Sequence, residues 1–186
     1  MLGARSQTVY AIAMILVLMG VAGSGKTSIG RRLAQTLGWQ FIEGDDFHPV
    51  ANVTKMTKGS PLTDTDRLPW LTALRQKIEQ FQARNISAIV ACSALKQSYR
   101  AILQGDDRPS VQFIYLQAHP DTVRSRLVQR HNHFMKADML ASQFATLEPP
   151  DDTLTIQTDA YPSIDAVVAH LTAAIGLTPP TPPDSG

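Results

Sequence analysis

The chain has few of the features that mark secreted, membrane-spanning or nucleic-acid-binding proteins. Cys92 is the only cysteine among 186 residues, so no disulfide can form within the chain and no cysteine-rich zinc site is indicated. The formal net charge is only +1, which provides no overall field to attract nucleic acid or an anionic membrane. We therefore expect a cytoplasmic protein without a nucleic-acid or membrane partner, in which any anion is bound by local groups.

Long hydrophobic runs are also scarce. The apolar stretch at residues 9–22 is shorter than the roughly 20 residues that cross a bilayer as a helix, and the single Arg5 before it is weak for a signal peptide. Met14 lies inside this stretch and begins a strand-like segment, so residues 1–13 are expected to be an extension. Residues 177–186 are rich in proline and are expected to be a disordered tail. Residues 14–176 then form one domain.

Within this domain, apolar segments alternate with helical patterns. Leu71, Leu74, Ile78 and Phe81, for example, recur at the spacing of one helix face. We expect strands at 15–19, 39–46, 86–92, 111–118 and 153–158, and helices at 26–37, 66–85, 94–103, 120–131, 138–147 and 163–176. Apolar strands that alternate with helices predict an α/β fold, with a five-stranded parallel sheet covered by helices on both faces.

The segment "GVAGSGKTS" connects the first expected strand to the first expected helix. Gly20, Gly25, Lys26 and Thr27 fit the pattern G-x-x-x-x-G-K-[ST] of a phosphate-binding loop. Glycines let backbone N–H groups approach a phosphate closely, and the helix that follows adds the positive end of its dipole. Lys26 is expected to reach the β- and γ-phosphates and Thr27 to bind Mg²⁺. The predicted nucleotide-binding residues are Gly20, Ala22, Gly23, Ser24, Gly25, Lys26, Thr27 and Ser28. The alternative is a glycine-rich turn beside a surface lysine.

Five segments in order resemble the gluconokinases, small P-loop carbohydrate kinases similar to shikimate kinase. They are "LMGVAGSGKTSIG", "EGDDFHPVANVTKM", "GSPLTDTDRLPWL", "ACSALKQSYR" and "HFMKADMLASQFATLE", and the resemblance covers about residues 14–148. The resemblance implies a P-loop fold like that of nucleoside monophosphate kinases, with a lid. It also implies ATP-dependent phosphorylation of the terminal hydroxyl of D-gluconate, with Mg²⁺, and it allows a homodimer.

The resemblance also implies roles for residues after the second strand. Glu43 and Asp45 match an acid-x-acid pair that serves the metal and the acceptor hydroxyl, although many relatives carry aspartate at the first position. Asp46 is expected to be a solvated loop acid. His48 is expected to contact a hydroxyl of the sugar acid, the alternative being a packed or capping loop histidine. Arg67 is expected to clamp the gluconate carboxylate, because its planar fork suits that group, or else to pair with Asp64.

Further basic residues are expected to contact the two substrates. Lys96 and Arg100 are four residues apart and are expected to share a helix face that contacts the acceptor, unless it is only a solvated basic face. The lid implied by the resemblance, at about 130–137, places Arg126 and Arg130 near ATP and His133 near the acceptor. An ordinary basic helix end is the alternative for these arginines. Cys92, Trp39, Trp70, Met139 and Phe144 are expected to be core residues.

Two other functions stay open on the sequence. Another small-molecule kinase, acting on shikimate or a nucleoside monophosphate, shares the phosphate loop, but the segments "DFHP" and "PLTDTDR" favour gluconate as the acceptor. A nucleotide-binding regulatory module of the GTPase kind would carry the strings N-K-x-D and D-x-x-G, and neither occurs in the chain.

Overall fold

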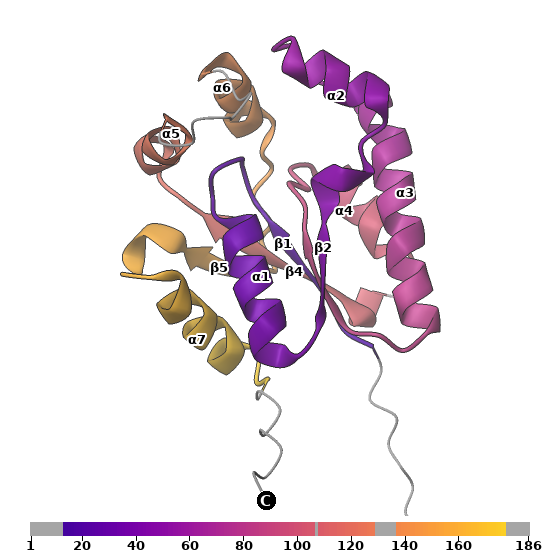
Figure 1. The fold of residues 1–186 in the computed structure, drawn as a ribbon, viewed down its shortest axis with the longest axis vertical. Helices are drawn as coiled ribbons and strands as arrows, with labels where there is room; N and C mark the ends of the chain where they lie inside the picture. The colour runs from indigo at the N-terminus through magenta and orange to yellow at the C-terminus, as the bar shows by residue number, and fades with distance from the viewer. Residues whose placement is uncertain (1–12, 107, 129–136, 178–186) are drawn as a thin grey trace, which may run out of the picture.

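A computed structural model describes residues 13–106, 108–128 and 137–177. Its five strands form one parallel sheet in the order β2-β3-β1-β4-β5. These strands are β1 (Ile15–Met19), β2 (Gln40–Glu43), β3 (Ala88–Ala91), β4 (Val111–Gln117) and β5 (Leu154–Gln157). The predicted five-stranded parallel sheet is confirmed, and β1 lies at its centre (Figure 1).

Helices cover both faces of the sheet. Figure 1 shows α1 (Lys26–Leu37) and α7 (Ile164–Ala174) on one face, and α3 (Asp64–Ala83) and α4 (Gln97–Gln104) on the other. The remaining helices, α2 (Val50–Thr57), α5 (Pro120–Val128) and α6 (Ala137–Thr146), lie beyond the carboxyl ends of the strands. In parallel sheets this edge is where ligands bind.

The side chains of β1 connect the two halves of the core. Successive residues of a strand point to opposite faces of a sheet. Ile15, Val17 and Met19 accordingly pack with α3 and α4, whereas Leu16 and Leu18 pack with α1 and α7. Burial on both faces explains why the segment is apolar at every position.

Several element boundaries differ from the sequence prediction. The second strand ends at Glu43 and is followed by a 3₁₀ turn at Gly44–Phe47. Helix α2 has no counterpart among the expected helices. Helix α3 begins at Asp64, two residues earlier than expected, because Thr63 and Asp66 form a capping box at its start. Its predicted apolar face is confirmed, since Leu71, Leu74, Ile78 and Phe81 are buried in it.

The ends of the domain extend slightly beyond the predicted boundaries. Ala13, assigned to the extension, is buried, and its N–H donates to the side-chain oxygen of Asn85 at 2.9 Å. Leu177, assigned to the tail, packs against the core formed with α1 and α7. The rest of both segments, residues 1–12 and 178–186, lies outside the described residues. Among the described residues, no helix combines the length and apolar character needed to cross a membrane.

Candidate active site

The phosphate loop follows β1 directly and turns into α1. Gly20 has φ of +141°, and a Cβ at this position would lie 2.6 Å from the carbonyl oxygen of Leu116. The neighbouring strand β4 therefore excludes a side chain at Gly20, independently of any phosphate. The Nζ atom of Lys26 donates to the carbonyls of Gly20 and Val21, at 2.9 Å each, so the loop closes around its lysine.

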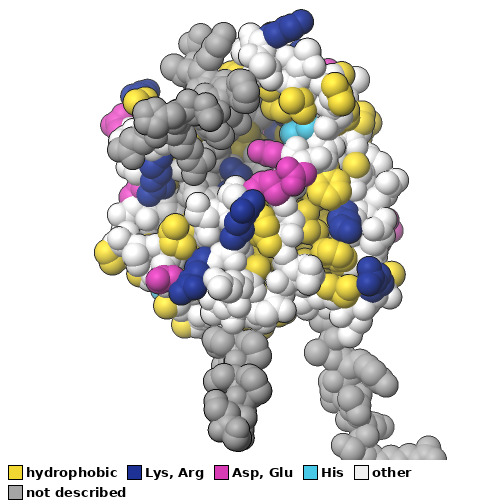
Figure 2. All heavy atoms as spheres, in the orientation of Figure 1, with side chains coloured by type: hydrophobic (Ala, Val, Ile, Leu, Met, Phe, Trp, Pro, Cys, Tyr) yellow, Lys and Arg dark blue, Asp and Glu magenta, His cyan; other side chains and the backbone are white. Residues whose placement is uncertain are grey.

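This loop lies between two cavities. The first, of about 280 Å³, is bordered by Lys26 and Thr27 and by residues that follow β2, β3 and α2; we call it the acceptor cleft. The second, of about 500 Å³, is bordered by Gly23, Ser28 and Arg126 and by the segment between β5 and α7. A molecule with phosphates at the loop can therefore extend into one cavity while a second molecule enters the other. Figure 2 shows acidic side chains beside a histidine near the middle of the face of the molecule that it displays.

Ser24 is a fully buried residue of the loop. Its hydroxyl oxygen has no hydrogen-bond partner among the described residues. A buried polar atom without a partner is costly unless another group satisfies it. Together with the glycines of the loop, this hydroxyl is consistent with a polar ligand such as a nucleotide phosphate.

Two of the predicted acids lie at the entrance to the acceptor cleft. Glu43 ends β2 and is hydrogen-bonded by the side chain of Thr27, while Asp45 lines the same cleft. Burial raises the pKa of Glu43 above its ordinary value, the Thr27 hydrogen bond lowers it less, and the charges of Asp45 and Asp46 add to the rise. Asp46 is exposed and does not line the cleft, as expected for a solvated acid.

The residues next to Lys26 fit a magnesium ion that is bound mainly by phosphate and water. The Thr27 hydroxyl and the Glu43 carboxylate, which are in contact, are hard oxygen ligands of the kind that Mg²⁺ prefers. The described part of the chain contains no group of three or more His, Cys, Asp or Glu residues that could hold a metal alone. Mg²⁺ sites in phosphoryl-transfer proteins commonly use one or two carboxylates together with the substrate phosphates.

His48 forms one wall of the acceptor cleft. Its ring stacks on Trp70 with centroids 4.2 Å apart and an interplanar angle of 18°, and the Trp70 Nε1–H donates to the carbonyl of Gly44 at 2.7 Å. Burial lowers the pKa of His48, and the Arg67 charge lowers it further against the opposing effect of Asp45. His48 is therefore packed against Trp70 and also borders the acceptor cleft.

Arg67 also lines the cleft and participates in a charged network between α3 and α4. Its Nη1 donates to the Tyr99 hydroxyl at 3.2 Å and lies 3.7 Å from Asp64 Oδ1. The Tyr99 hydroxyl in turn donates to Asp64, and both oxygens of Asp64 accept from Lys96 Nζ, at 2.9 and 2.8 Å. The Asp64 pair considered for Arg67 is therefore present, and Arg67 still borders the cleft.

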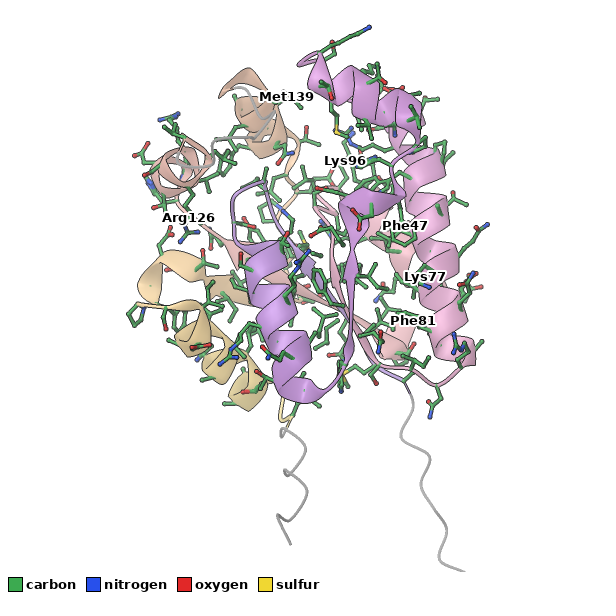
Figure 3. The ribbon with its side chains drawn as sticks, in the orientation of Figure 1. Phe47, Lys77, Phe81, Lys96, Arg126 and Met139 are labelled. Carbon is green, nitrogen blue, oxygen red and sulfur yellow. The ribbon has the colours of Figure 1, made fainter. Side chains whose placement is uncertain are left out.

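Lys96 and Arg100 do not share a helix face as predicted. Helix α4 begins at Gln97, Lys96 precedes it in an extended conformation, and Ala94 has φ of +42°, so the spacing rule for helices does not apply. Lys96 pairs with Asp64 and lies beyond the strand ends in Figure 3. Arg100 donates through Nη1 to three carbonyls, those of Ala94, Leu95 and Glu148. Neither residue borders the acceptor cleft.

Arg126 lies at the second cavity, on the opposite side of the loop (Figure 3). Its guanidinium contacts Asp159 at 3.2 Å and the carbonyl of Gly23 at 3.4 Å. It thus connects α5 both to the phosphate loop and to the segment after β5. Arg130, His133 and nearly all of the predicted lid lie outside the described residues.

Some cleft residues were not found from the sequence. Gln143 of α6 accepts the Ala22 N–H of the phosphate loop through Oε1 at 2.7 Å, across 121 residues of chain. Trp70 and Met139 were expected to be core residues; both are buried and also line the cleft. Met139 is labelled in Figure 3. Glutamine in a helix has no local signal for such a contact, which depends on where α6 is placed. The assignment of Cys92 to the core is confirmed, and burial raises the pKa of its thiol to about 12.

Comparison with known proteins identifies the family. A family model described as an AAA domain matches residues 15–150. A gluconokinase of Gluconobacter oxydans (strain 621H) is 45% identical over 157 residues, covering 84% of this chain and 88% of the relative. The chain belongs to the gluconokinase family. The thermoresistant gluconokinase of Escherichia coli (strain K12) is 43% identical, covering 83% of this chain and 89% of its own length.

Solved structures agree with this gluconokinase assignment. A gluconokinase from Sinorhizobium meliloti 1021 superposes with a TM-score of 0.75 at 36% identity, covering 89% of this chain and 97% of that one. A sugar kinase from Janibacter sp. HTCC2649 gives 0.81 at 36% identity, covering 90% and 96%. A shikimate kinase from Bacteroides thetaiotaomicron, at 16% identity and a TM-score of 0.60, covers 88% of this chain and 99% of that one and shows the shared fold alone.

Proposed function

We propose that this protein transfers the γ-phosphoryl group of ATP to the terminal hydroxyl of D-gluconate, giving 6-phospho-D-gluconate and ADP. The observation that carries the proposal is the position of the phosphate loop between two cavities. One of them, the acceptor cleft, contains Asp45, His48 and Arg67. These residues belong to segments shared with gluconokinases, and together they offer an acid, a ring nitrogen and a guanidinium to a hydroxylated carboxylic acid.

On the nucleotide side, catalysis consists mainly of positioning and charge neutralisation. The loop from Gly20 to Ser28 supplies backbone N–H groups to the phosphates, and the cation of Lys26 faces the β- and γ-phosphates. Thr27 and Glu43 would hold Mg²⁺, which would neutralise phosphate charge when bound. Arg126 borders the second cavity, where we place the nucleoside, and Arg130 completes the phosphate contacts from the lid.

On the acceptor side, Asp45 accepts the hydrogen bond of the reacting hydroxyl, orients it toward the γ-phosphate and receives its proton late in the transfer. Arg67 binds the gluconate carboxylate, and Lys96 supports Arg67 through their shared partner Asp64. His48 and, from the lid, His133 contact hydroxyl groups. Arg100 is a structural residue in this scheme, because its guanidinium holds three carbonyls together.

The proposal extends to the cellular location of the protein and to its partners. Cys92 is a buried free thiol and the chain can form no internal disulfide, which suits the reducing cytoplasm. We further propose that the protein acts on small molecules, without a nucleic-acid or membrane partner, and that it can form a homodimer.

A coupled assay of ADP release tests the function directly. We expect D-gluconate to stimulate ADP release far more than other sugar acids, shikimate or nucleoside monophosphates, and the stimulation to require Mg²⁺. ADP release that responds to shikimate or to a nucleoside monophosphate instead would support the alternative kinases. Slow release that responds to no acceptor would support a regulatory nucleotide-binding module.

The variant Lys26→Ala serves as the control in that assay. No other residue of the loop can supply a cation to the γ-phosphate, so phosphoryl transfer should be abolished while the fold is retained. Near-normal turnover of a folded Lys26→Ala protein would contradict the assignment of the phosphate loop.

A further inference from the structure

Asn52 is a buried polar residue of α2 that contacts the histidine of the acceptor cleft. Its residue surface is only 5% exposed. Its Nδ2 lies 2.7 Å from the backbone carbonyl oxygen of Asp66 and 3.4 Å from His48 Nδ1. A carbonyl oxygen can only accept a hydrogen bond, so the atom that faces it must be the amide nitrogen. The orientation of the Asn52 amide is therefore fixed by Asp66.

This orientation determines which nitrogen of His48 carries the proton. The amide nitrogen has two hydrogens and cannot accept, so toward His48 Nδ1, 3.4 Å away, it can only donate the hydrogen not used by Asp66. A ring nitrogen that accepts carries no proton, and in neutral imidazole the proton then lies on Nε2. The charged groups that act on His48 are Asp45 and Arg67, and its pKa is lowered overall because burial outweighs the effect of Asp45.

The position of the ring is fixed as well. Trp70 stacks against it and is itself held by the carbonyl of Gly44, and the His48 side chain is only 5% exposed. His48 Nε2 lies 4.0 Å from Asp45 Oδ1, too far for a direct hydrogen bond. A single oxygen atom at about 2.8 Å from each would bridge the two groups.

We propose that Asn52 fixes the Nε2–H form of His48, so that His48 and Asp45 together recognise a hydroxyl group. His48 donates to the hydroxyl oxygen while Asp45 accepts the hydroxyl proton. The same position disfavours a carboxylate oxygen, which has no hydrogen for Asp45, and an ammonium group, which has no lone pair for His48. Asn52 is a positioning residue that acts through His48. That the hydroxyl belongs to gluconate rests on the proposed function. The Nε2–H form of His48 does not depend on it.

The first test uses the unmodified protein. Long-range ¹H–¹⁵N spectra of histidine-labelled protein at neutral pH, without ligand, distinguish protonated from unprotonated ring nitrogens. The signals of His48 are assigned by their loss in His48→Gln. We expect a protonated Nε2 and an unprotonated Nδ1. A proton on Nδ1, in the neutral or the doubly protonated ring, would overturn the proposal.

The second test reverses the hydrogen bond. In Asn52→Asp a carboxylate of nearly the same size accepts where the amide donated, so His48 Nδ1 should gain a proton in the same spectra. Where the ring of this variant is neutral, Nε2 has lost its proton, and we expect kcat/KM for gluconate to fall about tenfold or more, the effect of one lost hydrogen bond, with KM for ATP unchanged. An unprotonated Nδ1, or an undiminished kcat/KM in a variant whose Nε2 carries no proton, would also overturn the proposal.

Thr54→Ala is the matched control on the same helix. Thr54 is exposed and, within the described part of the chain, its hydroxyl bonds only the carbonyl of Val50 in its own helix, so the His48 spectrum and the kinetics should both be retained. If Asn52→Asp does not fold, as judged by circular dichroism, the spectrum of the unmodified protein still decides. If that spectrum is as expected but gluconate is not phosphorylated, the proposed function fails and the role of Asn52 is supported.

Discussion

Asp45 and Asp46 are neighbours in the sequence, yet only Asp45 lines the acceptor cleft. The 3₁₀ turn at Gly44–Phe47 places successive side chains in different directions, so one acid borders the acceptor cleft and the other does not. At the scale of single residues, the role of each aspartate thus depends on backbone geometry, which the sequence of two consecutive aspartates does not reveal.

Asp45→Asn tests this difference. The substitution keeps the size of the side chain but removes the charge that orients the hydroxyl. We expect turnover with gluconate to fall about a hundredfold or more, in the range of general-base catalysis, with ATP affinity little changed. Asp46→Asn is the control and should retain turnover. The reverse result would show that the roles of the two acids are exchanged.

Asp66 provides a prediction about pH. Its carboxylate accepts from Lys55 Nζ at 2.5 Å and from the Thr63 N–H at 2.6 Å, which together hold the pKa of Asp66 far below its ordinary value, with the Lys55 contact the larger cause. A carboxyl with a depressed folded-state pKa stabilises the fold above its unfolded pKa, and the stabilisation is lost as pH falls through the folded pKa.

Asp66→Asn should therefore lower the free energy of unfolding at neutral pH, and by progressively less once the pH drops below about 4, the ordinary aspartate range. Urea unfolding at a series of pH values measures this. Asp151→Asn, at an exposed position, is the control. A difference from the unmodified protein that stays constant down to acid pH would contradict the prediction.

At the scale of elements, the end of β2 is held tightly against β3. A Cβ on Gly44 would lie 2.4 Å from the carbonyl oxygen of Ala91, closer than any real contact. A side chain there must push the turn that carries Asp45 away from the sheet. The glycine in "EGDD" therefore has a packing role that fixes the position of the acid after it.

Gly44→Ala should cost about 1–3 kcal/mol of stability, the range for overpacking, and should reduce turnover as well, because Asp45 is displaced. Thermal or urea unfolding together with the ADP assay measures both effects. In the control Gly176→Ala, the added Cβ has no neighbour within 4 Å, so turnover should be retained. Full activity and stability in Gly44→Ala would show that the turn can move without consequence.

At the scale of the whole molecule, the described contacts of the domain begin at Ala13, which is buried and bonded to Asn85. We expect removal of residues 1–12 to leave the free energy of unfolding and the turnover almost unchanged, since β1 and the hydrogen bond between Ala13 and Asn85 are retained. Urea unfolding and the ADP assay check this. A marked loss of either would show that the removed residues contribute to the domain.

The parts of the molecule that the sequence predicts well are those with local causes. Continuous apolar segments identified the strands, because strands of a parallel sheet are buried on both faces. The spacing of apolar residues identified the buried face of α3. The phosphate loop was found because phosphate binding requires glycines, a lysine and a threonine at set positions. Helix α2 was missed because it has only eight residues and buries only Asn52, while its apolar residues Val53 and Met56 line the acceptor cleft.

By itself the sequence determined the α/β class, the parallel sheet, the phosphate loop and the segments shared with gluconokinases. Only the tertiary structure decided which polar residues meet. It brought Gln143 to the loop amide of Ala22, 121 residues away, engaged Lys96 with Asp64 rather than the cleft, and placed Asn52 against His48. The physical reason is that a hydrogen bond needs its two atoms about 3 Å apart, and packing of distant elements, not spacing along the chain, sets that distance.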